Sequence, residues 1–288
     1  MKLGQIDVNI VPDGYFKLDG GVMFGQAPRV LWEKLVKPDR RNRIRLGLNC
    51  LLIQTPRQKI LVDTGIGSKF NDSLKESYGV NASRLLRNLR AMGITAKDVT
   101  HVVLSHLHFD HCGGATKFNR KNQAVPTFPR AKYLVQRTAW EDALHPNERG
   151  RASFHKEDFL PLEARGQLTL LDGDAELAPG ILLKVTNGHC RGHQIILVNH
   201  GGHRLAYFGD VIPTPHHLTL PYITALDQFP EETLDRKREF LALAEREGWL
   251  LTFGHGYDCS SGYLDRHRGQ IRLRPFDLND TAPAKKPG

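Results

Sequence analysis

The segment from Val102 to Gly114 has the sequence VVLSHLHFDHCGG. Three histidines and one aspartate lie within six residues, directly after an apolar run and directly before a pair of glycines. Residues two apart in a strand point to the same side of it, so we expect His106 and His108 to project together from a strand end. Asp110 and His111 come where the strand gives way to a loop, and they can reach a second point nearby. The segment therefore predicts ligands for two metal ions.

Three later segments also finish an apolar run with a side chain that can bind a metal. VTNGHC, LAYFGD and LLTFGHG place His189, Asp210 and His255 at the ends of expected strands. A histidine-rich surface loop, or a hydrogen-bonded core histidine, explains isolated neighbours among the 14 histidines of the chain. Neither explains four strand ends that all finish in ligand-type side chains.

The motifs HLHFDH, GH, GD and GHG, in this order, resemble the metallo-β-lactamase superfamily, an αββα sandwich with a dinuclear metal site between its sheets. The resemblance implies one metal on three histidines, a second metal on an aspartate and two histidines, and an aspartate that bridges them. In this order, the residues are His106, His108 and His189; Asp110, His111 and His255; and Asp210.

The resemblance also assigns Asp63, in LVDTG, to orienting a ligand from behind. The alternative for Asp63 is an ordinary turn aspartate at a strand end. His193 is expected to support the ligands or to have a structural role. Nitrogen and oxygen ligands without a thiolate suit zinc first, and iron, manganese or cobalt as well. We therefore expect two divalent metal ions.

The order of strands and helices predicts the fold class. Strands are expected at 48–55, 59–65, 102–108, 168–173 and 181–190, a hairpin at 194–210, and a final strand at 249–258. Residues 131–144 are expected to be a strand leading into a helix, with further helices at 81–94 and 230–248 and a loop-rich insertion at 118–166. Two groups of strands, each followed by helices, fit two mixed sheets packed face to face with helices outside. We expect one α/β domain over 1–278 and a disordered tail over 279–288.

Composition restricts the class of protein. The 288 residues contain 40% hydrophobic and 25% charged residues, which is ordinary globular usage. No apolar run approaches the length of a membrane span, and the N-terminus lacks the apolar region of a secretory signal, so we expect a cytoplasmic protein with no membrane partner. Its four scattered cysteines predict free thiols. The net charge of +9 is spread, with one cluster at 40–45, and predicts solvated faces more than a nucleic-acid site.

Two metals that share a water lower its pKa towards neutrality, so we expect hydrolysis by attack of a metal-bridging hydroxide. Asp110 is the candidate proton shuttle to the leaving group. The segments LDGGVMFGQAP, SHLHFDHCGG and GDVIPTPHHLTLPYITALDQFPEETLDRKREFL resemble the quorum-quenching branch that opens N-acyl-homoserine lactones. That branch also resembles the methyl parathion hydrolases, so a phosphotriester hydrolase is the alternative. An RNA-processing nuclease is the third hypothesis.

The small-molecule pocket is less defined by the sequence. Met23 and Phe24 are candidates for an apolar wall around an acyl chain, and a plain core role is the alternative. His216 and His217 either line the pocket or are exposed. Tyr222 is the candidate donor of a hydrogen bond to the substrate carbonyl, although it stands twelve positions after Asp210. The resemblance also implies a homodimer formed through N-terminal segments.

Overall fold

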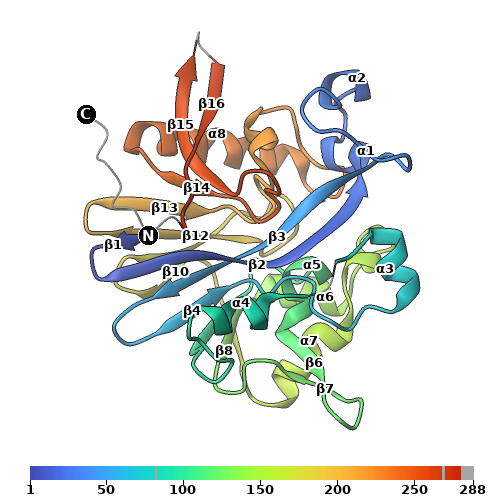
Figure 1. The fold of residues 1–288 in the computed structure, drawn as a ribbon, viewed down its shortest axis with the longest axis vertical. Coiled ribbons are helices and arrows are strands. Elements are labelled where there is room, and N and C mark those ends of the chain that lie inside the picture. The colour runs from blue at the N-terminus through green and yellow to red at the C-terminus, as the bar shows by residue number, and fades with distance from the viewer. Residues whose placement is uncertain (82, 268–269, 280–288) are drawn as a thin grey trace.

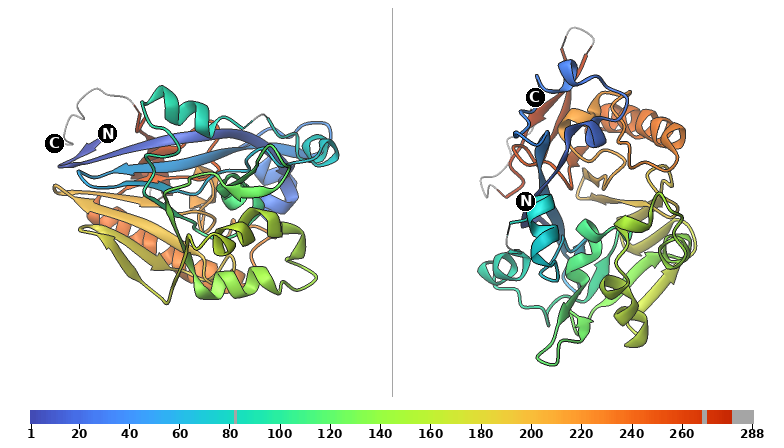
Figure 2. Two further views of the ribbon diagram at one scale, coloured as in Figure 1. Left: turned by 90° about the horizontal axis from the view of Figure 1, so that it is seen from below. Right: turned by 90° about the vertical axis from the view of Figure 1, so that its right-hand side faces the viewer.

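The computed structural model describes residues 1–81, 83–267 and 270–279. Within these residues, two seven-stranded sheets pack face to face, as Figure 1 and the left view of Figure 2 show. The first sheet has the order β1 (Lys2–Leu3), β2 (Ile6–Asp19), β3 (Arg43–Gln54), β4 (Lys59–Val62), β5 (His101–Val103), β8 (Lys132–Gln136) and β9 (Leu168–Leu171). The second has the order β10 (Ala175–Ala178), β11 (Ile181–Val185), β12 (Gln194–His200), β13 (His203–Tyr207), β14 (Leu250–Thr252), β15 (Ser261–His267) and β16 (Gln270–Pro275).

Some of the helices cover the outer faces of the two sheets. The α-helices of the described residues are α1 (Gly20–Phe24), α2 (Arg29–Trp32), α3 (Asp72–Tyr78), α4 (Leu85–Ala91), α5 (Phe109–Cys112), α6 (Arg137–Leu144), α7 (Lys156–Ala164) and α8 (Pro230–Glu247). Apolar side chains of α4, α6 and α7 join the core on the outer face of the first sheet. Those of α8 join the core on the outer face of the second. Four layers result, which confirms the predicted αββα sandwich.

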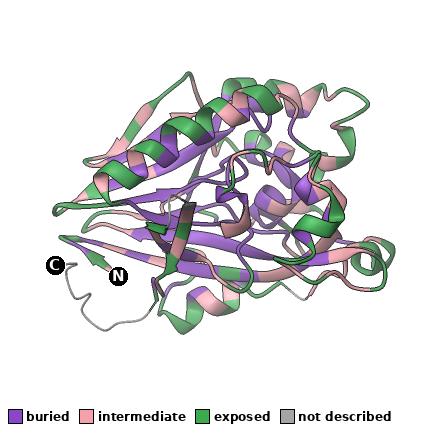
Figure 3. Ribbon diagram, turned by 90° about the horizontal axis from the view of Figure 1, so that it is seen from above, coloured by how far each residue is buried: buried purple, intermediate pink, exposed green. Residues whose placement is uncertain are grey.

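The strands are apolar on both faces because each sheet is covered twice. In β12, Ile196 and Val198 join the core between the sheets, while Ile195 packs towards α8. In β3, Leu51 faces the space between the sheets and Leu52 faces the helices of the first layer. Alternation with a period of two residues thus fills both cores from one strand. Figure 3 shows the result, with buried strands inside and an exposed outer face on α8.

Parallel pairing brings the functional segments to one edge. β4 pairs in parallel with β5, and β13 pairs in parallel with β14. The loops that follow these strands therefore leave from the same end of their sheet. Ligands commonly bind at such carboxyl ends of strands in α/β proteins. This edge is where the segments after β4, β5, β11, β13 and β14 meet.

The structure differs from several sequence-based predictions of the elements. β2 was not predicted, because Pro12, Gly14 and polar residues interrupt its alternation, and a bulge accommodates them. The strand expected over 102–108 ends at Val103, and Asp110 and His111 lie in α5 rather than in a loop. A hydrogen-bonded helical turn replaces the expected extended segment, because the backbone N–H of Cys112 donates to the carbonyl of His108 at 2.9 Å.

Three further boundaries change. The supposed insertion at 118–166 contains β8, an internal strand of the first sheet, together with α6 and α7. The segment 249–258 is not the final strand, because β15 and β16 follow it. The helix expected over 81–94 is shorter and is α4. The hairpin of β12 and β13 and the helix α8, which ends before Gly248, agree with the predictions.

Asn279 marks the end of the described chain. Its side chain accepts from the backbone N–H of Ile10 at 3.0 Å and donates to the Ile10 carbonyl at 2.9 Å, so this first residue of the predicted tail is held by β2. Residues 280–288, the rest of that prediction, lie outside the described residues. No described helix is both long and apolar enough to span a membrane. The predicted cytoplasmic location stays a prediction.

Candidate metal centre

Seven side chains that follow four strands converge between the two sheets. His106 and His108 follow β5, and Asp110 and His111 lie in the short helix α5. The remaining three follow strands of the second sheet, in the order His189, Asp210 and His255. The structure thus brings together all seven residues that the motifs singled out. Their ligand atoms fall into two groups, and within each group the atoms lie within 4.8 Å of one another.

The first group consists of His106, His108 and His189. His189 Nε2 lies 3.1 Å from His108 Nδ1, and the rings of His106 and His108 have centroids 4.4 Å apart. Asp210 faces this group through Oδ2, which lies 3.3 Å from His189 Nε2 and 4.0 Å from His106 Nε2.

The second group consists of Asp110, His111 and His255. The Nε2 atoms of His111 and His255 lie 3.1 Å apart, and Asp110 Oδ2 lies 3.4 Å from His255 Nε2. Asp210 faces this group through its other oxygen, Oδ1, which lies 3.1 Å and 3.2 Å from the same two nitrogens. One carboxylate therefore stands between two clusters of ligand atoms.

The polar atoms of the centre fit metal ions better than a hydrogen-bonded core. His106 Nε2 and Asp210 Oδ1 are buried and have no hydrogen-bond partner within the described part of the chain. Such atoms are costly unless something else satisfies them. His111 and His255 also turn ring nitrogens towards each other at 3.1 Å, where a hydrogen bond forms only if one nitrogen carries a proton and the other does not. Cations between these atoms would satisfy all of them.

The charge states of two histidines and of the shared aspartate suit cation binding. Burial holds the pKa of His106 and His108 well below the usual imidazole value, so both rings are neutral and keep a lone pair. Burial also opposes the charge on Asp210, but His111, His255 and His189 hold the pKa of its carboxyl well below its usual range. The carboxylate between the two groups is therefore ionised.

Asp63 lies behind the second group and contacts His111, as the predicted orienting role requires. Its Oδ2 lies 2.8 Å from His111 Nδ1 and accepts from the hydroxyls of Ser105 at 2.8 Å and Tyr207 at 2.9 Å. Its Oδ1 accepts from the Ser105 backbone N–H at 2.7 Å. His255 is fixed in the same manner, since its Nδ1 lies 2.8 Å from the carbonyl of Gly47. The residues that set these rings belong to strands or directly follow them.

Asp227 supports the first group and was not found by the sequence analysis. Its Oδ1 lies 3.0 Å from His189 Nδ1 and accepts from the Thr224 hydroxyl at 2.6 Å. It stands 38 residues after His189, and no motif marks it. The buried Lys237 of α8 fixes the preceding loop, because its ammonium donates to the carbonyls of Thr219, Leu220 and Tyr222.

His193 holds the backbone of Asp210. Its Nε2 accepts from the Asp210 N–H at 3.0 Å, and its Nδ1 lies 2.6 Å from the Thr186 hydroxyl. Burial lowers the pKa of His193 to about 3, so the ring is neutral and can accept that bond. The expectation that His193 supports the ligands remains a prediction with this geometry behind it.

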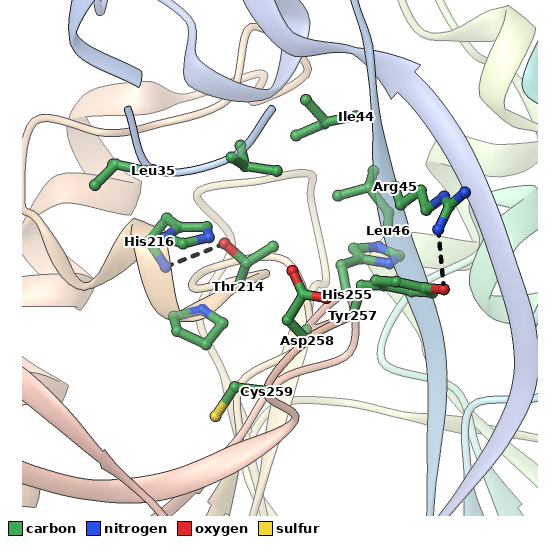
Figure 4. A pocket seen from close by; sticks show the side chains of 13 residues that line it. Leu35, Ile44, Arg45, Leu46, Thr214, His216, His255, Tyr257, Asp258 and Cys259 are labelled. Carbon is green, nitrogen blue, oxygen red and sulfur yellow. Dashed lines mark hydrogen bonds between the residues drawn. The ribbon is translucent and has the colours of Figure 1, made fainter. Parts of the chain in front are cut away.

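A cavity of about 250 Å³ opens beside His255 (Figure 4). One side of it is apolar, and the other carries Arg45, Tyr257 and Asp258. Of the four predicted pocket residues, His216 lines this cavity. The other three are buried in the core and are not among the residues that line it: Met23, Phe24 and His217.

The burial of these three residues has a physical reason. The ring of Phe24 stacks on Trp32, with centroids 5.4 Å apart, and on His217, with centroids 5.2 Å apart. His217 Nε2 lies 2.8 Å from the carbonyl of Met23. Tyr222 packs edge-on against Phe24 at 5.5 Å, and its hydroxyl has no hydrogen bond within the described residues. Its predicted role as a donor stays a prediction.

The arginine cluster at 40–45 is largely engaged within the chain. Arg43 pairs with Asp39 at 3.0 Å, and Arg41 lies 3.5 Å from Glu76. The guanidinium of Arg45 lies near two tyrosine rings, those of Tyr15 and Tyr257. The four cysteines are free, as predicted.

Comparison with known proteins places this geometry in a family. The model of the metallo-beta-lactamase superfamily matches residues 44–255. An N-acyl homoserine lactonase of Bacillus thuringiensis is 32% identical over 166 residues, which is 54% of this chain and 59% of that relative. The crystal structure of a probable metal-dependent hydrolase from Staphylococcus aureus has a TM-score of 0.86 at 28% identity, covering 95% of this chain and 99% of that one.

A second solved structure is an N-acyl homoserine lactone hydrolase with the product N-hexanoyl-L-homoserine bound at its catalytic metal centre. It has a TM-score of 0.68 at 25% identity and covers 90% of this chain and 95% of that chain. The family match spans most of the chain and includes all seven converging residues. This chain therefore belongs to the metallo-beta-lactamase superfamily.

Proposed function

We propose that the protein is a dinuclear metal-dependent lactonase that opens N-acyl-homoserine lactones. The observation that carries the proposal is the division of Asp210 between two groups of ligand atoms, one on each oxygen. The lactonase relatives support the substrate class. The alignment with the Bacillus relative leaves about two-fifths of that protein unmatched. The lactonase activity of the relative is therefore a proposal for this chain.

In this proposal, the first group and the second group would each hold one divalent ion, with Asp210 shared. Zinc is the proposed metal, because the donors are nitrogen and oxygen without thiolate. When bound, the two ions would supply a water of lowered pKa and polarise the substrate carbonyl.

The chain's own residues would then position the substrate and move a proton. Asp110 is the most exposed of the seven, with 11% of its side chain accessible, so it can reach both the centre and the substrate. The oxygen of a water would add to the lactone carbonyl while Asp110 takes one of its protons, and as the ring C–O bond breaks, Asp110 would pass that proton to the leaving oxygen. Tyr222, whose hydroxyl has no partner within the described residues, would donate to the carbonyl oxygen.

The test is a panel of substrates given to the zinc-loaded protein. We expect opening of N-hexanoyl-homoserine lactone, with loss of activity after chelation and in His108→Ala. His203→Ala is the matched control, because His203 is exposed on β13, away from the centre. Hydrolysis of paraoxon with every lactone left intact would replace the lactonase by a phosphotriester hydrolase. Tyr222→Phe tests the donor, with an expected loss of about tenfold in kcat/KM.

A further inference from the structure

An arginine at the rim of the cavity is held in place by two aromatic rings. The Cζ atom of Arg45 lies 5.5 Å from the ring centroid of Tyr15 and 5.6 Å from that of Tyr257. Figure 4 shows its Nη1 bonded to the Tyr257 hydroxyl, at 3.4 Å. The two rings meet edge to face, with centroids 5.4 Å apart. Cation–π contacts of this kind fix a planar guanidinium.

Arg45 has no acidic partner among the described residues, unlike its neighbours. Arg43 is paired with Asp39, and Arg41 with Glu76. A guanidinium has five N–H donors, and the only side-chain hydrogen bond of Arg45 within the described chain uses one of them. Most of its donors therefore remain available to a ligand in the cavity.

The position of Arg45 relates it to the metal centre. Gly47 accepts from the ring of His255 at 2.8 Å and donates its N–H to the His255 carbonyl at 3.0 Å. Arg45 stands two residues before Gly47 in β3, which is about 7 Å along the strand, and Tyr257 stands two residues after His255 in a turn. A substrate whose reacting carbonyl lies beside His255 thus has the next few atoms of its chain near Arg45.

The rest of the cavity restricts the kind of group that Arg45 can bind. Leu35, Ile44 and Leu46 form an apolar wall suited to an alkyl chain. Asp258 lines the same cavity and opposes an anionic ligand. A neutral oxygen acceptor on an otherwise apolar chain satisfies all of these conditions.

We propose that Arg45 is a specificity-determining residue that donates a hydrogen bond to a carbonyl oxygen on the acyl chain of the substrate. The inference rests on the proposed function and narrows its substrate class to lactones with an oxo group near the amide, such as a 3-oxoacyl chain. The guanidinium bond to that oxygen is charge-assisted. A saturated acyl chain offers no acceptor and gains nothing from Arg45.

The experiment compares Arg45→Gln with the unmodified enzyme on two lactones, N-(3-oxohexanoyl)- and N-hexanoyl-homoserine lactone. We expect KM for the oxo substrate to rise about tenfold, with KM for the saturated substrate and both kcat values unchanged. Arg57→Gln, in the exposed turn between β3 and β4, is the matched control. Arg45→Lys should lose part of the preference, because it keeps the charge but not the planar set of five donors. An equal change for both substrates, or no change, would overturn the proposal.

Binding of the ring-opened products separates this inference from the proposed function. By calorimetry, we expect the unmodified protein to bind N-(3-oxohexanoyl)-homoserine about tenfold more tightly than N-hexanoyl-homoserine, and Arg45→Gln to bind both alike. If neither lactone is hydrolysed but this difference in Kd is measured, the lactonase proposal fails and the role of Arg45 stands. Equal Kd values in the unmodified protein would refute the role of Arg45 whatever the activity.

Discussion

The two halves of the candidate metal centre are supported from different parts of the fold. In the second group, His111 is set by Asp63 at the end of β4, and His255 by the carbonyl of Gly47 in β3. In the first group, His189 is set by Asp227, which lies in the long connection before α8. Both rings of the second group are therefore held from the first sheet, whereas His189 of the first group is held from a loop that Lys237 ties to a helix. From this difference we expect the second group to be the more rigid half.

The residue shared by both halves should have the largest effect. Asp210→Ala removes the carboxylate that faces both groups, so we expect both metals to be lost and kcat/KM to fall by at least about a thousandfold. Elemental analysis and a lactone assay measure the two effects. Asp265→Ala, at an exposed position on β15, is the control. Near-normal metal content and activity in Asp210→Ala would show that the halves do not depend on a shared ligand.

The next effect is expected at the rigid half. Asp63→Asn weakens the acceptor that binds His111, Ser105 and Tyr207, so we expect metal affinity to fall about 10- to 100-fold. The free energy of unfolding should fall by about 3 kcal/mol, because the buried donors lose a charged acceptor. Chelator competition and denaturant unfolding measure the two quantities. A loss of stability with unchanged metal affinity would mean that Asp63 serves the core and not the ligands.

A smaller effect is expected at the loop-held half. Asp227→Asn keeps the shape of the side chain but removes the charge beside His189, and we expect metal affinity to fall about tenfold. The unfolding free energy should change less than in Asp63→Asn, since the supporting loop can adjust. A titration that counts the metal ions bound per chain tests whether only one of two sites is weakened. A loss exceeding that of Asp63→Asn would reverse the comparison.

The smallest effect concerns the core behind the cavity, and it depends on pH. Burial lowers the pKa of His217 from its usual value of 6.5 to about 3. The unfolded chain therefore binds a proton between these values that the folded protein does not, so stability is lost as the pH falls below 6.5. His217→Leu should remove about 2 kcal/mol of the decrease between about pH 7 and pH 4.5. Denaturant midpoints at both pH values measure it, and parallel curves for the two proteins would contradict the assignment.

The strand-end ligands could be singled out from sequence because each lies in a short local motif. HLHFDH places four of the seven in six residues, and the other three follow apolar runs directly. Asp227 could not be found in this way, because its contact with His189 depends on how a long loop packs. β2 was not predicted for another reason. Its bulge at Pro12 to Gly14 interrupts the alternation of apolar and polar residues on which a strand prediction depends.

The pocket shows where residue type stops being informative. Met23 and Leu35 are both apolar residues of the connection between β2 and β3, but Met23 is buried whereas Leu35 lines the cavity. Hydrophobicity predicts that a side chain leaves water, not which neighbour it meets. Only the fold decides which of them contacts a ligand.

Part of the cavity wall comes from a segment that supplies none of the seven converging side chains. Leu35 and Val36 belong to the connection between β2 and β3, whereas the seven side chains follow other strands. We therefore expect a change in the length or composition of this connection to reshape the lining more than the converging side chains. Sequence changes in this connection, natural or engineered, are thus expected to alter which substrates fit the cavity more than the reaction itself.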